Sequence, residues 1–521
     1  METDHAIAHA QECGRSSRSV LTVKCDHDLH GHETGLPLQP MASRLPQEAI
    51  PAAPFTEPDA QQYKRFSPRH KVFISGVLAF CALLSPVSST MVLSAIPEVA
   101  HSFATSGNVI SLSNALYLLF MGLSACFWGP ISNVYGRRWA AIMSALQFCA
   151  FNVGTAMAPN LAAFYVFRIL TALQGTGLLI MGSSCLGDIY EPTTRATALG
   201  WFSLATVFGS AFGPFAGGVI VTFRSWRVIF WLQAAMGGVG TVLLVLFLPE
   251  TLLTKKIDSL GLHDSSSSPS SSRPSRRVRV MAILSWISPW RVLVLLVSYP
   301  NLLATGLASS ALIWNMYSLL TPIRYVLNPR FQLTSPLQAG LFYIAPGCGY
   351  LAGSPFGGRW ADHTVKKWIR RRDGRREPED RLRSSCGFLG VLLPACVLLY
   401  GWSVQKQFGA IPLPAITLFL QGAVQWLCFP SLNTYALDVM QHHGLSAEVV
   451  AGNYMIRYIF AAIGSAVCLP AIQAMGVGWF STVSAALLVL AEIAVWATTV
   501  WGASWRERVD EKRRRQKMQN S

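Results

Sequence analysis

Charged side chains are scarce in this sequence of 521 residues. Asp, Glu, Lys and Arg together make up 13% of it, whereas 51% is hydrophobic, and the mean hydropathy is +0.37. A soluble protein of this length needs a larger charged and polar surface than these residues supply. The shortage of charge therefore excludes an ordinary soluble protein of several domains.

Metal-binding and disulfide patterns are also missing. The eleven cysteines form no CxxC pair and no Cys/His cluster with zinc-site spacing, and most of them fall in apolar segments. Those segments hold no Asp/Asp, His/Glu or Ser/His arrangement at catalytic spacing. We therefore expect no metal, no bound cofactor and no enzymatic activity. The first seventy residues also lack the short apolar core of a cleavable signal peptide.

Long apolar runs are abundant instead. Because about twenty apolar residues cross the ~30 Å of hydrocarbon as a helix, we predict twelve spans. With both termini in the cytosol, cytosolic segments hold 35 of the 42 Lys and Arg, in keeping with the positive-inside rule. The net charge of +16 thus reflects membrane topology and attraction to lipid headgroups, not nucleic-acid binding. The predicted spans are 72–95, 108–128, 139–158, 161–182, 196–220, 227–248, 292–320, 337–357, 385–403, 412–434, 447–472 and 478–502.

Two low-complexity segments divide the chain. Residues 1–70, rich in Ser, His, Pro and Gln, predict a disordered cytosolic tail, and the serine- and arginine-rich residues 249–290 predict a cytosolic linker. The linker separates an N-terminal six-helix bundle over 71–248 from a C-terminal six-helix bundle over 291–502, and a basic cytosolic tail follows over 503–521. Duplicated halves of this kind form a known transporter architecture. We expect a functional monomer.

The loop after the second span has a distinctive order of residues. It contains Gly129, Asn133, Gly136, Arg137 and Arg138, and a partial copy with Gly358 and Asp362 follows the eighth span. The loop resembles the signature of the major facilitator superfamily, whose glycine turn and arginines hold neighbouring helices in one of two states. The resemblance implies an all-α membrane protein with the major facilitator fold, two six-helix bundles with pseudo-two-fold symmetry. Asn133 replaces the expected aspartate and cannot form its ion pair.

Glycines recur at intervals of four residues in spans five and eight. That spacing leaves one helical face smooth enough for close approach by another helix. In major facilitators these spans pack across the boundary between the halves, so we expect the two strips to face each other; a dimerisation strip is the alternative. The span-five pattern resembles the motif of antiporters. The residues are Gly209, Gly213, Pro214, Gly217 and Gly218 in span five, and Gly349, Gly353 and Gly357 in span eight.

Further segments resemble one subgroup of the fungal twelve-span drug:proton antiporters. Residues 188–195 and 248–251 match the loops after spans four and six, and residues 340–349 and 376–383 resemble exporters for quinidine resistance, dityrosine and short-chain acids. The resemblance implies an efflux pump of the plasma membrane, of the kind associated with multidrug resistance or secondary metabolite export, driven by a proton gradient. Span one contains no Asp or Glu to carry the proton, which leaves Asp188 and Glu492 as candidates.

Two arginines inside spans are candidates for cargo recognition. Because inserting an arginine costs ~2.5–3.5 kcal/mol, it marks a functional position by default. Arg168 and Gln174 match a family motif in span four, and Arg457 lies about ten residues into span eleven, roughly 15 Å deep. Few acids are available to pair with Arg457, so we expect an anionic group on the cargo. The alternatives are snorkelling of Arg168 toward water and bonding of Arg457 to backbone carbonyls. Further substrate-binding candidates, which could instead join helices, are Asn114, Tyr117, Trp314, Asn315, Gln425 and Asn433.

The sequence thus predicts a transmembrane transporter that exports a drug, a secondary metabolite or an organic acid. Exchange for protons and alternating access of the two halves are implied by the family resemblance. A membrane sensor that keeps a transporter fold without transporting is the alternative. The long tails and Asn133 favour that sensor, whereas the intact glycine strips oppose it.

Overall fold

The computed structural model describes residues 65–190, 192–251, 289–332, 336–373, 377–440 and 446–519, all within the unit Thr56–Ser521. The predicted tail over 1–70 and the linker over 249–290 lie almost entirely outside the described residues. Within the described ranges every regular element is a helix, which confirms the predicted all-α class.

The first half consists of six long helices with one short continuation. Local signals set several of the boundaries: the Ser67 side chain caps α2 ahead of Pro68, and Asn160 Oδ1 accepts a hydrogen bond from the Ala163 amide at the start of α6. The helices are α2 (Pro68–Thr90), continued by η1 (Met91–Ala95) and α3 (Ile96–Ser102), then α4 (Gly107–Tyr135), α5 (Arg137–Ala156), α6 (Leu161–Ile189), α7 (Pro192–Phe223) and α8 (Arg227–Phe247).

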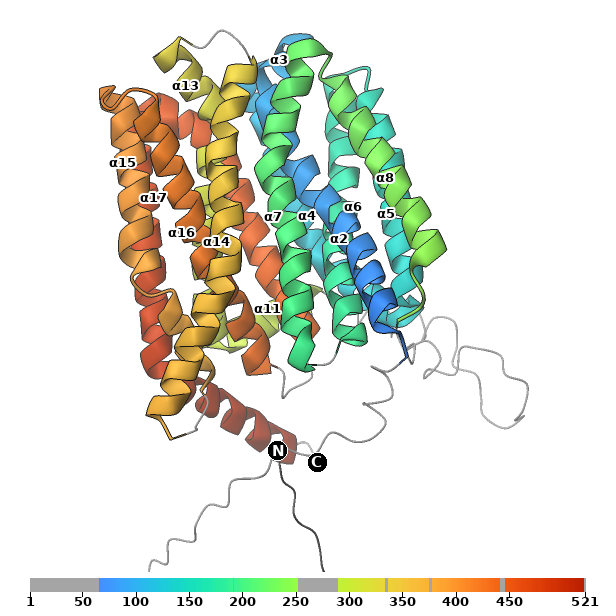
Figure 1. Ribbon diagram of the computed structural model, residues 1–521, viewed down its shortest axis with the longest axis vertical. Coiled ribbons are helices and arrows are strands. Elements are labelled where there is room, and N and C mark those ends of the chain that lie inside the picture. Colours follow the sequence, from blue (N-terminus) through green and yellow to red (C-terminus); the bar gives the residue numbers. More distant parts are fainter. Residues whose placement is uncertain are drawn as a thin grey trace, which may run out of the picture. The chain divides into compact units, whose positions relative to one another are not determined.

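The second half repeats this pattern with more interruptions. Its elements are α11 (Pro289–Ser298), α12 (Pro300–Leu320), α13 (Ile323–Phe331), α14 (Pro336–Arg371), η2 (Pro378–Ser384), the π-helix η3 (Phe388–Leu392), α15 (Leu393–Lys406), α16 (Pro412–Met440) and α17 (Ser446–Gln519). Figure 1 shows α3 and α13 at one end of the bundle, and the last turns of α17 at the opposite end. We name these the α3 end and, after the turn between α4 and α5, the Gly136 end.

The predicted spans correspond to these helices. Ten stretches of the described residues are long and apolar enough to cross a membrane. The last stretch, Val449–Lys512, contains Gly476, whose φ of 82° and ψ of 167° interrupt the helix, so it supplies spans eleven and twelve. The remaining predicted span is α14, which has 36 residues. Large apolar side chains lie exposed on the outside, among them Trp201 (70%), Phe223 (71%) and Val391 (71%), as expected for helices that face lipid.

Some predicted boundaries differ from the structure. The seventh span, predicted as one helix over 292–320, is broken at Tyr299, which is extended (φ −111°, ψ 101°) because the following Pro300 disfavours helical geometry in the residue before it. The eighth span continues as α14 to Arg371, beyond the predicted residue 357, since helix can extend past the hydrocarbon where the residues become polar.

The two halves meet along two pairs of helices, α4 against α17 and α7 against α14. Figure 1 shows α7 and α14 side by side in the middle of the molecule. Their backbones approach closely, because a Cβ added at Gly347 of α14 would lie 3.0 Å from the Cβ of Ala211 on α7. This boundary between the halves contains the site described next.

Candidate functional site

A cavity of about 100 Å³ lies between the halves. Pockets for drug-sized ligands measure ~300–1,000 Å³, so the cavity in this conformation is too small for such a ligand. Binding a drug-sized molecule requires the two halves to move apart. Its lining comes from six helices: Pro86 and Ser89 of α2, Leu179 of α6, Ser203, Thr206 and Ser210 of α7, Ile313, Met316 and Tyr317 of α12, Trp426, Phe429 and Asn433 of α16, and Tyr454, Arg457 and Tyr458 of α17.

The two walls of the cavity differ in chemistry. The first-half wall carries small hydroxyls that largely bond within their own helix, such as Thr206 Oγ1 to the Ser203 carbonyl at 2.7 Å. The second-half wall carries aromatic rings and one cation. A hydrogen bond of 3.0 Å between the hydroxyls of Ser89 and Tyr317 connects the walls. A molecule bound here thus meets its charged and aromatic partners on the second half.

Arg457 is the cation of the second-half wall. Its guanidinium donates a hydrogen bond to Asn433 Oδ1 and lies over the rings of Phe429 and Tyr454, at 4.7 Å and 5.4 Å from their centroids. The side chain is 5% exposed, and its Nε has no hydrogen-bond partner. Among the described residues no carboxylate pairs with Arg457. A buried cation without an anion is costly, so Arg457 leaves the cavity wall with an uncompensated positive charge.

Arg168, the other arginine within a span, lies elsewhere. It is 1% exposed and is not among the residues that line the cavity. Its Nη1 donates to the Ser88 carbonyl at 3.3 Å and its Nη2 to Asn114 Oδ1 at 3.0 Å. The guanidinium also lies 4.3 Å from the centre of the Tyr117 ring. The structure therefore does not bring the two arginines together around one cargo group.

The remaining predicted contacts are divided between the cavity and the helix interfaces behind it. Asn433 lines the cavity beside Arg457. Trp314 Nε1 donates to Ser484 Oγ at 3.2 Å, toward span twelve. Asn315 and Gln425 are fully buried, and neither side chain has a hydrogen-bond partner for its amide oxygen or nitrogen. Gln174, also buried, has no partner for its Oε1.

Sequence reasoning missed the aromatic part of the site. Trp426 and Phe429 stack with their centroids 4.9 Å apart, and Tyr454 and Tyr458 stack at 6.1 Å. A usable signal was present for α17: Tyr454 precedes Arg457 by three residues and Tyr458 by four, so its ring neighbours both side chains on the helix surface.

Comparisons with known proteins agree with this architecture. A family model described as Major Facilitator Superfamily matches residues 78–465. The chain belongs to the major facilitator superfamily. Curated relatives include "MFS antiporter QDR3" of Candida albicans, 24% identical over 87% of this chain and 81% of the relative. "Dityrosine transporter 1" of Saccharomyces cerevisiae is 24% identical over 88% of this chain and 86% of the relative.

Solved structures show the same fold. The crystal structure of the human organic anion transporter MFSD10 superposes with a TM-score of 0.61 at 16% identity, over 82% of this chain and all of that one. This likeness confirms the predicted major facilitator fold. Membership of the family, together with the long apolar helices, makes the protein a multi-pass membrane transporter of small molecules and does not favour the sensor alternative.

The signature loop of this major facilitator joins three of the motifs noted in the sequence. At the turn, Gly136 has φ 104°, and the Arg137 amide donates to Glu250 Oε1 at 2.9 Å. Arg137 Nε lies 3.4 Å from Asp188 Oδ2, an ion pair between the start of α5 and the end of α6. Arg138 Nη2 donates to the Val245 carbonyl at 2.8 Å. The side chain of Asn133 is not among those described, but Asp188 supplies an acid for Arg137 from another helix.

The copy of this loop in the second half forms a different ion-pair cluster. Asp362 lies 3.4 Å from Arg381 Nη1, and Arg381 Nε lies 3.2 Å from Asp438. The cluster connects the extended end of α14 with η2 and the end of α16. Asp362, the acid retained in this copy, thus pairs with Arg381 of η2.

The prediction that the two glycine strips face each other is wrong. On α7 the strip packs against α2 and η1: a Cβ at Gly209 would lie 3.0 Å from the Leu83 carbonyl oxygen, and one at Gly213 3.4 Å from the Met91 nitrogen. On α14 the strip packs against α16, where a Cβ at Gly357 would lie 2.6 Å from the Trp426 carbonyl oxygen. Each strip therefore brings two helices of its own half together.

The two candidate proton carriers lie away from the cavity lining. Asp188 bonds to Arg137 and accepts a hydrogen bond from Thr251 Oγ1 at 3.4 Å. Glu492, half-buried in span twelve, sits so near η3 that a Cβ at Gly390 would lie 2.5 Å from its Cγ. Its Oε2 has no hydrogen-bond partner.

Proposed function

We propose that this transporter exports a small organic molecule that carries a negative charge, with Arg457 as the residue that holds the charged group. The cargo is an organic acid, or a drug or secondary metabolite with an acidic group. Export proceeds by alternating access of the two halves and in exchange for protons. The protein resides in the plasma membrane with both termini in the cytosol, so that the α3 end faces outward.

The observation that carries this proposal is the unpaired cation on the cavity wall. Arg457 has aromatic neighbours and an amide oxygen, but no carboxylate among the described residues pairs with it. Aromatic faces and Asn433 stabilise the cation without neutralising it. An anionic cargo supplies the missing negative charge, and the rings beside it provide apolar surface for the rest of the molecule.

Direction and coupling draw support from the sequence. The glycine pattern of α7 resembles that of antiporters, and one relative is named an antiporter. The excess of Lys and Arg in the segments assigned to the cytosol supports the orientation.

Efflux of matched charged and uncharged probes tests the role of Arg457. Cells that express the wild-type chain, Arg457→Ala or Arg457→Lys are loaded with labelled benzoate, succinate or the uncharged benzamide, and efflux is followed at neutral pH. We expect Arg457→Ala to reduce carboxylate efflux by about 10- to 100-fold, since a hydrogen bond to a charged group contributes ~1.5–3 kcal/mol.

Arg457→Lys keeps the charge and should retain part of this activity, whereas any benzamide efflux should be unchanged in both variants. Carboxylate export by the wild type that survives Arg457→Ala undiminished contradicts the proposal. Surface amounts of each variant are measured alongside, to separate lost transport from lost protein.

A further inference from the structure

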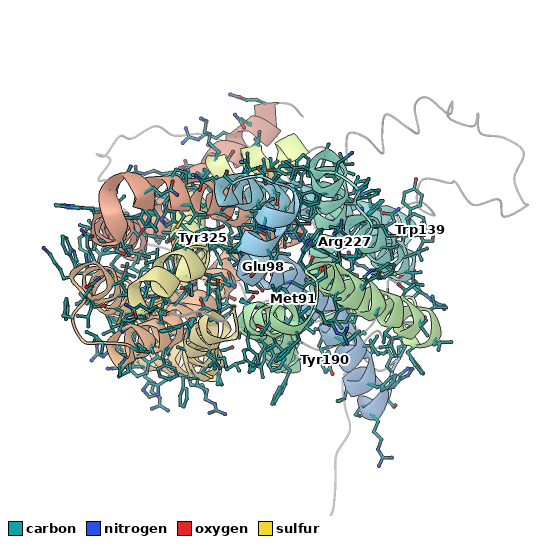
Figure 2. The ribbon with its side chains drawn as sticks, turned by 90° about the horizontal axis from the view of Figure 1, so that it is seen from above. Met91, Glu98, Trp139, Tyr190, Arg227 and Tyr325 are labelled. Carbon is teal, nitrogen blue, oxygen red and sulfur yellow. The ribbon has the colours of Figure 1, made fainter. Side chains whose placement is uncertain are left out.

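A row of hydrogen bonds joins α4 to α17 at the α3 end, across the boundary between the halves. Ser111 Oγ donates to the Ser465 carbonyl at 2.9 Å, Asn114 Nδ2 to Ser465 Oγ at 3.5 Å, and Asn108 Nδ2 to Gln473 Oε1 at 3.4 Å. The three α4 residues recur every three positions and so share one helical face. We call this row the outer seam. In Figure 2 the molecule is seen from this end, where Glu98 and Tyr325 are labelled.

Asn114 connects the outer seam to the buried arginine. Its Oδ1 accepts a hydrogen bond from Arg168 Nη2 at 3.0 Å, while its Nδ2 donates to Ser465. An arginine side chain can only donate hydrogen bonds, so it forces the amide oxygen of Asn114 to face α6. The amide nitrogen must then face the other half. Arg168 thereby sets the direction in which Asn114 bonds.

Arg168 is itself held by three helices of the first half. Besides Asn114 and the Tyr117 ring on α4, it contacts the Ser88 carbonyl on α2 and lies 5.7 Å from the centre of the Phe230 ring on α8. The Ser88 carbonyl lies just before Met91, where the α-helix changes to a 3₁₀-helix. Because 3₁₀ hydrogen bonds reach back three residues instead of four, carbonyls at such a junction are left without a partner in the helix and can accept hydrogen bonds from side chains. The next residue, Ser89, bonds to Tyr317 across the cavity. Arg168 is thus connected to the outer seam through Asn114 and lies next to the Ser89–Tyr317 hydrogen bond, without reaching the cavity.

We propose that Arg168 is a positioning residue that acts through Asn114 to keep the outer seam closed. Opening the α3 end requires that Ser465 leave Asn114, and the fixed orientation of that amide favours the closed arrangement. Arg168 therefore sets the balance between the two access states and does not contact the cargo. This role is independent of the cargo's identity.

Thiol labelling measures how often the outer seam opens. Ala115 is 4% exposed and lies one turn beyond Ser111, so a cysteine placed there reacts with a membrane-impermeant maleimide only when the seam opens. Asn108→Cys, at the partly exposed rim, verifies that the α3 end faces the reagent, so a wrong orientation is recognised separately. The chain without an added cysteine gives the background of the native thiols.

Asn114→Leu is the most direct variant, because a side chain of similar size has no group that bonds to Ser465, whereas an Asp at this position could still accept a hydrogen bond from the Ser465 hydroxyl. We expect it to increase labelling at Ala115→Cys about fivefold, as for the loss of a hydrogen bond of ~1 kcal/mol. Arg168→Lys, which loses the forked geometry, should act in the same direction. Ser465→Ala should also increase labelling, whereas Ser465→Thr keeps the hydroxyl and should restore the wild-type rate.

Ser113→Ala is the matched control, since the Ser113 hydroxyl bonds to the Ile110 carbonyl within α4 at 2.8 Å. A second cysteine, Ser203→Cys on the cavity wall, is labelled from the opposite side in inside-out vesicles. A shift between access states leaves this labelling unchanged or lowers it, whereas general loosening raises both. The proposal is overturned if Asn114→Leu and Arg168→Lys label at the rate of Ser113→Ala, or if labelling rises equally on both sides.

Discussion

Two buried arginines of this transporter occupy different surroundings, although the sequence marks both in the same way. Arg168 and Arg457 are both buried arginines inside spans, yet one bonds to a carbonyl and an amide behind the cavity and the other lies on its wall. The difference arises from neighbours on other helices. Asn114 and the Ser88 carbonyl hold the Nη atoms of Arg168 behind the cavity, whereas Arg457 lies over the rings of Phe429 and Tyr454 on the wall. The Nε of each arginine has no hydrogen-bond partner.

The signature loop provides a prediction at this scale. Gly136 has φ 104° and ψ 151°, a region that is essentially restricted to glycine, so Gly136→Ala should destabilise the protein by ~1–3 kcal/mol. Gly129, in the same loop motif, is helical and has open space at its Cβ position, so Gly129→Ala should be tolerated. Thermal unfolding of the two purified variants checks this, and equal midpoints would contradict it.

At the scale of elements, the sequence predicted where the helices lie in the chain better than which helices pack against each other. Each predicted span corresponds to a helix of the structure, and all but α14 fall in stretches apolar enough to cross a membrane, because the length of an apolar run and the thickness of the bilayer are linked. Spacing showed that the glycines of α7 and α14 lie on one face each, but spacing within a helix carries no information about which helix faces it. The strips therefore pack against α2 and α16, contrary to the prediction.

The packing of α14 on α16 leads to a test with a control on the same helix. A Cβ at Gly353 would lie 3.0 Å from the Ala423 Cα and still closer to the backbone carbonyl of that residue, whereas a Cβ at Gly358 meets nothing within 4 Å. Gly353→Ala should therefore cost ~1–3 kcal/mol through overpacking. Gly358→Ala should be neutral or slightly stabilising, since alanine favours helix.

The measurement is the thermal midpoint of each variant in detergent, followed by size-exclusion chromatography. If both substitutions lower the midpoint by the same amount, helix packing is not the cause. Efflux by Gly353→Ala at a temperature where it remains folded separates stability from transport.

For the whole molecule, the sequence indicated two halves with a cavity between them but not how the cavity is built. The unpaired Arg457 could be located from the shortage of acids alone. Tyr454 could be placed beside it from their spacing in α17, but Trp426 and Phe429 of α16 could not, because aromatic residues are common throughout the spans and only the fold selects those that meet. The same holds for the outer seam, whose partners on α4 and α17 are more than 350 residues apart in sequence.

The end of α17 packs against elements of the second half at the Gly136 end of the molecule (Figure 1). Arg506 lies 3.6 Å from the buried Glu379, and the Tyr299 hydroxyl donates to Asp510 Oδ1 at 2.8 Å. Val509 packs against the core between these two contacts. The last helix thus connects η2 with the junction of α11 and α12, so the basic segment predicted as a tail begins as part of the folded second half.

A pair of truncations tests whether this contact stabilises the molecule. A chain that ends at Trp505 loses Arg506, Val509 and Asp510 and leaves Glu379 buried without that cation, which should lower the thermal midpoint and the yield of folded protein, because a buried charge without its partner is costly. A chain that ends at Glu511 keeps all three residues and loses only the following basic run. We expect it to have the thermal midpoint of the full chain. If instead its midpoint falls as far as that of the chain ending at Trp505, the basic run, and not residues 506–511, stabilises this end.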